Sequence, residues 1–159
     1  MASRRKGRIL AFQALYFWEA AGASPGPQRT ETSPEKKTLP QGLLDFSWLG
    51  DEKQARLDQG ISDFSRLLIL GTIENIRAID TMIRQHLKNW DFSRVNRVDL
   101  AVLRMSTYTL MYQPDIPPSI VINEAIGISR EFGTDDSYRF VNGVLDSIRK
   151  TLQNSEEPD

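Results

Sequence analysis

The chain has 159 residues, no cysteine, one histidine and a formal net charge of −1 at pH 7. This length suits one domain with a hydrophobic core of its own. Without cysteine there are no disulfides, zinc–thiolate sites or cysteine nucleophiles, and a single histidine excludes most histidine-based catalysis. No apolar run approaches the roughly 20 residues that cross a bilayer, and no signal-type segment follows the basic start. We therefore expect a cytoplasmic protein without a membrane segment.

The charge is distributed unevenly along the chain. Arg4, Arg5, Lys6 and Arg8 precede the first acid, Glu19, so the first 18 residues carry +4 and the remainder carries −5. A short cationic start on an acidic body indicates a local site for a polyanion. A solvated N-terminal tail is the alternative.

The first predicted helix begins after Ser3, a possible cap, and runs to about Ala21. Its apolar residues point to every side, which is typical of a helix enclosed by its neighbours. The basic first turns must then protrude from the core. Cations at a helix N-terminus oppose the macrodipole by some tenths of a kcal/mol, so local stability does not explain them, whereas a polyanionic partner does. Gly7 weakens this helix and is expected to let its first turn fray.

Residues 22–41 hold four of the eight prolines and little apolar mass, which predicts a flexible inserted linker. Lys36 and Lys37 in this linker can touch a nucleic-acid backbone or belong to a solvated loop. A short helix or hydrophobic anchor should follow, formed by Leu43, Leu44, Phe46, Trp48 and Leu49.

Helical periodicity returns over residues 52–87, where Gly71 is interpreted as a helix crossing point and His86 as a surface residue. Ser93 can cap the next helix, which ends before Pro114. Arg94, Arg97 and Arg104 add further cations there. They are either binding residues or partners of Asp99 in ordinary helix pairing.

Residues 117–152 predict two antiparallel helices joined by a tight turn. Pro118 suits a first helical position, Gly133 suits a left-handed closing residue, and residues 134–137 offer capping oxygens to the second helix. Arg139 and Lys150 lie opposite the apolar stripe of that helix. No strand-like alternation of useful length occurs, so the chain is expected to be all-α. We expect one domain over residues 1–152, followed by an acidic tail, 153–159.

Three segments together resemble the NusB family: RRKGRILAFQALYFWE, RVNRVDLAVLRMSTYTL and INEAIGISREFGTDDSYRFVNGVLDSI. The last is the most specific, because it spaces NEAI, FG, DS and FVNGVLD in the family's order. The resemblance implies about seven helices in two small bundles packed crosswise. It also implies a transcription antitermination factor without catalysis, cofactor or metal. Such a factor binds boxA RNA with NusE, a small-subunit ribosomal protein, and joins RNA polymerase and other Nus factors on rRNA operons. Both monomers and homodimers occur in the family.

The resemblance assigns residues to two surfaces. The RNA-binding set comprises Arg4, Arg5, Lys6, Arg8, Gln13, Tyr16, Phe132, Asp136, Arg139 and Phe140. Phe140 lies at the edge of its apolar stripe, so it either stacks on unpaired bases or is a partly buried core residue. Asp99 and Arg104 are assigned to the NusE-facing side.

Some positions depart from the family pattern. Tyr108-Thr109-Leu110 replaces the usual YEL, and Pro118-Ser119 stands where an aromatic residue and a lysine are common. Asn142 and Gly143 match, and we interpret them structurally: Gly143 as a close-packing position and Asn142 as a buried or half-buried hydrogen-bonding group.

Three alternative functions remain to be weighed. A pure protein–protein adaptor would show no preference for boxA RNA. The RNA-binding domain of an rRNA cytosine methyltransferase would need a second domain and a glycine-rich cofactor loop, which this chain lacks. A freestanding enzyme finds no support, because no phosphate loop, nucleophile–base pair or metal-ligand cluster occurs.

Overall fold

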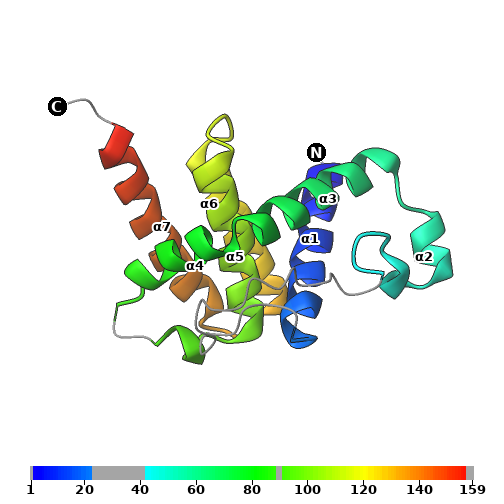
Figure 1. The fold of residues 1–159 in the computed structure, drawn as a ribbon, viewed down its shortest axis with the longest axis horizontal. Helices are drawn as coiled ribbons and strands as arrows, with labels where there is room; N and C mark the ends of the chain where they lie inside the picture. The colour runs from blue at the N-terminus through cyan, green and yellow to red at the C-terminus, as the bar shows by residue number, and fades with distance from the viewer. Residues whose placement is uncertain (1, 23–41, 89–90, 157–159) are drawn as a thin grey trace.

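The structure is a computed structural model that describes residues 2–22, 42–88 and 91–156, and these residues form helices joined by turns (Figure 1). In chain order the elements are α1 (Ala2–Ala20), the 3₁₀ helix η1 (Ser47–Leu49), α2 (Asp51–Ala55), α3 (Gln59–Glu74), α4 (Ile76–Gln85), the 3₁₀ helix η2 (Phe92–Arg94), α5 (Arg97–Tyr112), α6 (Pro118–Phe132) and α7 (Ser137–Glu156). The described residues contain no strand, so the predicted all-α class is confirmed. Nearly all of the predicted linker, with Lys36 and Lys37, lies outside the described residues.

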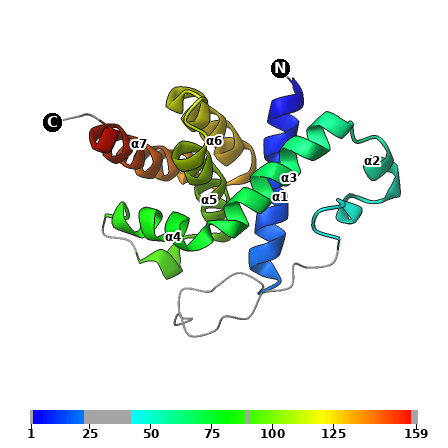
Figure 2. The same cartoon turned by 45° about the horizontal axis from the view of Figure 1, so that its top comes forward.

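Helix α5 occupies the centre of the molecule. Every residue from Asp99 to Thr107 is buried, and α1, α3, α4, α6 and α7 all contact this helix. Figures 1 and 2 show α1 and α3 crossing each other on one side of α5, and α4, α6 and α7 on the other side. This arrangement agrees with the expected two small bundles packed crosswise.

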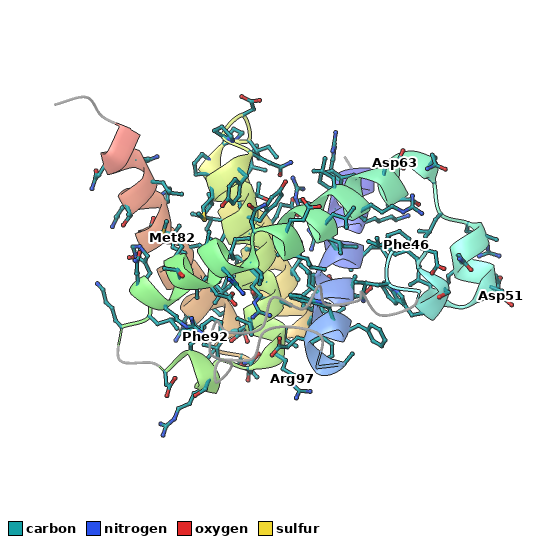
Figure 3. All side chains as sticks on the ribbon, viewed as in Figure 1. Phe46, Asp51, Asp63, Met82, Phe92 and Arg97 are labelled. Atoms are coloured by element: carbon teal, nitrogen blue, oxygen red, sulfur yellow. The ribbon has the colours of Figure 1, made fainter. Side chains whose placement is uncertain are left out.

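The chain before α2 is anchored in the core as the sequence predicted. Leu43 and Phe46 are fully buried, and Figure 3 shows Phe46 between α2 and the α1–α3 pair. The Nε of Arg66 donates a hydrogen bond to the carbonyl oxygen of Leu44 over 2.8 Å. This bond ties the anchor to α3.

The periodic stretch over residues 52–87 divides into α2, α3 and α4. A turn separates α2 from α3, and a second break falls at Asn75, whose Nδ2 donates to the carbonyl oxygen of Gly71 over 2.8 Å. Because α3 and α4 change direction at Asn75, both can pack on the central α5. Periodicity alone follows the apolar positions through this break and does not reveal it.

Two helix starts differ from the sequence prediction. The helix α1 begins at Ala2, so Ser3 lies inside it and is not its cap. The cap of α5 is Asn96 instead of Ser93, because the Asn96 side chain accepts a hydrogen bond from the backbone N–H of Asp99 over 2.8 Å. Ser93 belongs to η2, where its own N–H donates to Asp91 over 3.1 Å.

Glycines allow the close approach of helices at two crossings. A Cβ at Gly71 would overlap the ring of Tyr108, which confirms the predicted crossing of α3 and α5. Gly7 corrects a prediction: it is buried, a Cβ there would lie 2.5 Å from Cδ1 of Phe64, and its carbonyl oxygen accepts a hydrogen bond from Ser65 over 2.8 Å. Gly7 therefore permits the contact of α1 with α3 and is not a point of fraying.

The two C-terminal helices form the predicted hairpin, and Pro118 occupies the first turn of α6. Gly133 differs from expectation, because its φ of −95° and ψ of −167° are extended and not left-handed. A Cβ at Gly133 would lie 2.6 Å from Cβ of Ser137, so glycine is needed here for space. Helix α7 continues to Glu156, beyond the expected boundary at residue 152.

Candidate nucleic-acid interface

One side of α1 is largely open to solvent. Residues spaced by three or four positions share a helix face, and by this rule Arg5, Lys6, Gln13, Tyr16 and Phe17 lie within one arc of α1. We call these five residues the outer face of α1. Arg5 and Lys6 are exposed, Gln13 is half-buried, and the residues Tyr16 and Phe17 are 38% and 41% exposed. This face combines cations, an amide and two aromatic rings, which are the groups that bind single-stranded RNA.

Phe17 was missed by sequence reasoning. The run of apolar residues in this helix made Phe17 indistinguishable from the core residues around it. Its position four residues after Gln13 was the available signal, because that spacing places both side chains on one face. The expectation that α1 is enclosed on every side is therefore wrong for Tyr16 and Phe17.

The four N-terminal cations divide into two groups. Arg5 lies against α6: its Nη2 is 3.9 Å from Oε2 of Glu131, and a Cβ at Gly127 would lie 3.4 Å from the same nitrogen. Arg4 instead lies over the ring of Phe64 on α3, with its Cζ 4.3 Å from the ring centroid. Such cation–π contacts hold the Arg4 side chain without neutralising its charge.

Arg8 is half-buried, and its guanidinium lies 5.6 Å from the Phe64 ring centroid. It lines a small cavity together with Glu124 and Thr109. Burial lowers the pKa of Arg8, while the charge of Glu124 raises it and that of Arg4 lowers it further. Oε2 of Glu124 has no hydrogen-bond partner among the described residues. Arg8 thus faces the helix junction more than solvent, and its assignment to the RNA-binding set stays a prediction.

The turn between α6 and α7 lies beside α1 (Figure 2). The ring of Phe132, at the end of α6, lies with its centroid 5.3 Å from that of the buried Phe12. Phe132 and Phe140 are both half-buried, so each is packed on the core and still open at one edge. Asp136 is exposed, and its carbonyl oxygen accepts a hydrogen bond from the N–H of Phe140 over 3.2 Å.

Arg139 is exposed at the start of α7. Its Nε donates a hydrogen bond to the hydroxyl oxygen of Tyr138 over 3.0 Å, and this bond raises the pKa of Arg139. The guanidinium of Arg130, on α6, lies 4.5 Å from the Tyr138 ring centroid. Tyr138 therefore positions two exposed cations, a role that the sequence did not indicate.

The residues assigned to NusE from the sequence are buried, which corrects that assignment. Asp99 is 4% exposed and Arg104 is 1% exposed. Arg104 donates from Nε and Nη2 to Asp80 over 2.9 and 2.8 Å, and from Nη1 to Glu19 over 3.0 Å. Burial lowers the pKa of Arg104, but the hydrogen bonds and charges of the two carboxylates outweigh it and raise the pKa. Arg104 joins α1, α4 and α5 internally and is not available to a docking protein.

Asp99 is held by its own helix start. Its Oδ2 accepts a hydrogen bond from Nδ2 of Asn96 over 3.0 Å, and no arginine pairs with it among the described residues. Burial raises the pKa of Asp99, while hydrogen bonds from Ser137 and Asn96 act in the opposite direction. Arg94 and Arg97 are exposed, and Figure 3 shows Arg97 pointing away from the start of α5.

A second open surface is apolar and was not predicted. Leu67, Tyr112 and Ile120 are 49%, 42% and 46% exposed. The rings of Tyr108 and Tyr112 stack with their centroids 5.5 Å apart, and Tyr108 covers Gly71. We call these five residues, which come from α3, the end of α5 and the start of α6, the apolar surface.

Asn142 and Gly143 also differ from expectation. Both are exposed on α7, and no atom of another described residue would lie within 4 Å of a Cβ at Gly143, beyond the neighbouring backbone of the helix itself. Among the described residues, Gly143 therefore does not serve close packing. A glycine at an exposed mid-helix position costs roughly 1 kcal/mol relative to alanine.

The described residues contain no cluster of three or more His, Asp or Glu side chains that could hold a metal ion. His86 is half-buried, and its Nδ1 lies 2.7 Å from Oγ of Ser147. It links the end of α4 to α7 and is not simply a surface residue. Each described helix is too short or too polar to span a lipid bilayer.

Comparison with known proteins agrees with this geometry. The model of the NusB family matches residues 5–150. Transcription antitermination protein NusB of Treponema pallidum (strain Nichols) is 51% identical over 149 residues, covering 93% of each chain. The structure of T. maritima NusB has a TM-score of 0.73 and 35% identity, over 92% of this chain and 90% of that one.

A crystal structure of antitermination factors NusB and NusE in complex with dsRNA contains a chain of the same fold. Its TM-score is 0.73 at 22% identity, over 95% of this chain and 98% of that one. The family match covers all helices from α1 to most of α7, and the relatives align along almost their full length. The chain therefore belongs to the NusB family.

Proposed function

We propose that this chain is a transcription antitermination factor that binds single-stranded boxA-type RNA together with NusE. In this role it joins RNA polymerase and other Nus factors in the cytoplasm and promotes transcription of rRNA operons. It acts by binding, without catalysis or cofactor. The observation that carries the proposal is the outer face of α1, where exposed cations and two exposed aromatic rings lie beside the turn that presents Arg139.

Phosphates and bases would be bound by different side chains. Arg5 and Lys6 on this face, Arg4 beside it on the α3 side and Arg139 at the start of α7 are all exposed cations, and each can contact a phosphate. Tyr16 and Phe17 offer ring faces to unpaired bases, while Gln13 can hydrogen-bond a base edge. Phosphate contacts set position and affinity, and base contacts set the preferred sequence.

Four phosphate contacts make RNA binding by this chain strongly dependent on salt. On single-stranded RNA they correspond to a slope of about −3 in a plot of log affinity against log salt. A second protein that adds contacts and fixes the register would offset this loss at cellular salt. The apolar surface is the site that we propose for NusE, because Leu67, Tyr112 and Ile120 would be shielded from water by a docked protein.

The function is tested by titrating a boxA-type RNA with this chain, with and without NusE, at two salt concentrations. We expect tighter binding to boxA RNA than to a scrambled RNA of the same composition, and a further gain when NusE is present. Equal affinity for both RNAs would instead favour a protein–protein adaptor, the main alternative.

The cationic start is tested by changing Arg4 and Arg5 together to alanine. We expect RNA affinity to fall by about 1–3 kcal/mol and the salt slope to flatten by about 1.4, because two phosphate contacts are lost. The matched control changes Lys53 on the distant α2 and Arg56 directly after it; both are exposed, and their loss removes the same charge. If both double variants bind RNA equally, net charge and not this site governs binding.

A further inference from the structure

One exposed side of α7 continues from Arg139. Asn142 and Gly143 lie three and four residues after Arg139, and Asp146 lies four and three residues after them, so the four share one helix face. We call these four residues the α7 strip. Arg139, Asn142 and Gly143 are exposed, and Asp146 is half-buried. Figure 1 shows α7 running from the neighbourhood of α1 toward the C-terminal end of the chain, so the strip leads away from the outer face of α1.

Gly143 has no packing reason within the described residues. Gly7, Gly71 and Gly133 all lie where a Cβ would meet another side chain, whereas the space above Gly143 is open. Glycine is also the poorest helix former after proline, so alanine would suit this position in the isolated chain. A missing side chain at an exposed position leaves the backbone open to close approach by another molecule.

The strip is suited to a polyanion and not to a cation. Asp146 is its single acid, and Nη2 of Arg149 and Nζ of Lys150 lie 2.6 and 3.3 Å from its carboxylate oxygens. These contacts offset the charge of Asp146. Lys150 remains 65% exposed, so the strip is bounded by cations at both ends, Arg139 and Lys150.

We propose that the RNA path extends from α1 along the α7 strip, with one nucleotide lying flat against the bare backbone at Gly143. The exposed amide of Asn142 hydrogen-bonds an edge of the neighbouring base, because a carboxamide carries both a donor and an acceptor. Arg139 and Lys150, at the two ends of the strip, contact phosphates of the RNA that passes over it. The inference rests on the proposed RNA-binding function and adds to it a contact that depends on the absence of a side chain.

The test is Gly143→Ala in the full chain, measured by thermal unfolding and by fluorescence anisotropy with a labelled boxA-type RNA. A methyl group at Gly143 favours the helix, so we expect the melting temperature to rise by about 2–4 °C. The same methyl group blocks the nucleotide, so we expect the RNA dissociation constant to rise at least fivefold. Gly143→Gln, which is bulkier and also favours a helix, should weaken RNA binding further. Asn142→Ala should weaken binding and reduce the preference for boxA over scrambled RNA.

Thr151→Ala is the matched control, because Thr151 is exposed on the same helix and alanine also favours the helix there. It should raise the melting temperature and leave RNA affinity unchanged. If the unaltered chain and the Gly143→Ala variant bind boxA RNA equally well, the α7 strip proposal is overturned while the proposed function stands. If the unaltered chain does not bind boxA RNA, the proposed function fails and the strip proposal fails with it.

Discussion

Arg5 and Glu131 place opposite charges at the edge of the outer face of α1. Their closest atoms are 3.9 Å apart, and both side chains are about half exposed, at 53% and 52%. An ion pair of this kind contributes little to stability, because solvent screens it. We expect Glu131 to have a larger effect on the proposed RNA binding, since its negative charge lies where phosphates would approach Arg5.

Glu131→Gln should therefore strengthen RNA binding. The change removes one charge that repels phosphates and releases Arg5 from its ion pair. We therefore expect the RNA dissociation constant to be a few-fold lower at low salt, and the effect to be smaller at high salt because ions screen the charge. Filter binding at two salt concentrations measures both quantities. Glu52→Gln on α2 is the control, since Glu52 is an exposed acid paired with Arg56 far from α1. Weaker binding by Glu131→Gln would show that Glu131 itself contacts the RNA.

Arg104→Ala should destabilise the fold without acting directly on RNA. The change leaves the carboxylates of Asp80 and Glu19 without their buried partner, which typically costs 3–5 kcal/mol in unfolding free energy. Denaturant unfolding measures this loss. The double variant Asp80→Ala with Arg104→Ala should lose less than the sum of the single changes, because the two residues share one interaction. Additive losses would contradict a coupled network.

The helices α1 and α3 cross closely at Gly7. Two opposed effects act on the stability of Gly7→Ala. Helix propensity favours alanine by about 1 kcal/mol. Against this, a Cβ 2.5 Å from the Phe64 ring forces the helices apart. Overpacking of this kind typically costs 1–3 kcal/mol.

We therefore expect Gly7→Ala to lower the unfolding free energy by about 0–2 kcal/mol, the overpacking cost less the propensity gain. Phe64→Leu in the same chain should restore part of the loss by making room for the methyl group. Thermal or denaturant unfolding measures both variants. A higher unfolding free energy for Gly7→Ala would instead indicate that the first turn of α1 frays at Gly7.

The contact of α4 with α7 at His86 makes stability depend on pH. Burial lowers the pKa of His86, and the charge of Lys88 lowers it further. The folded state therefore favours the neutral imidazole of His86. The contribution of His86 to the unfolding free energy is fully present above its unfolded pKa of about 6.5, and it is lost as the pH falls through the lower folded pKa.

Unfolding free energy should thus decrease between pH 7 and pH 5. His86→Gln keeps a polar side chain beside Ser147 but does not titrate, so its stability should change less over the same range. Denaturant unfolding at several pH values compares the two proteins. Identical pH profiles would assign the dependence to carboxylates elsewhere in the chain.

At the scale of the whole molecule, the helices present two surfaces of different chemistry. The outer face of α1 and the start of α7 carry cations and rings, whereas the apolar surface is formed by α3, α5 and α6. The two surfaces can therefore be altered independently. A homodimer that used the outer face of α1 would compete with RNA, so sedimentation with and without RNA distinguishes the two states.

Tyr112→Ser combined with Ile120→Ser should separate the two partners. Both residues are more than 40% exposed, so the change should leave the fold and the affinity for RNA alone nearly unaltered. The gain in RNA affinity on adding NusE should be lost, because apolar contact area is removed from the proposed NusE site. Anisotropy titrations with and without NusE measure this gain. An unchanged gain would place NusE on another surface.

The amino-acid sequence by itself determined the local features of this protein. The periodicity of apolar residues predicted the all-α class and most helices, and the signals around Pro118 and residues 134–137 predicted the C-terminal hairpin. The concentration of cations before Glu19 and the motifs from Asn123 to Asp146 indicated the RNA-binding class. These features depend on residues within one or two helical turns of each other, so the sequence displays them directly.

Only the tertiary structure decided which charged and small residues face outward. Arg104 is paired with Glu19, 85 positions away, and Gly7 is needed because Phe64, on α3, leaves no room for a Cβ. Arg8 faces the helix junction while Arg139 faces solvent, and Gly143 has open space where Gly71 has none. Burial depends on which helices pack together, and that packing is set by contacts between residues far apart in the chain, which periodicity within a single helix does not specify.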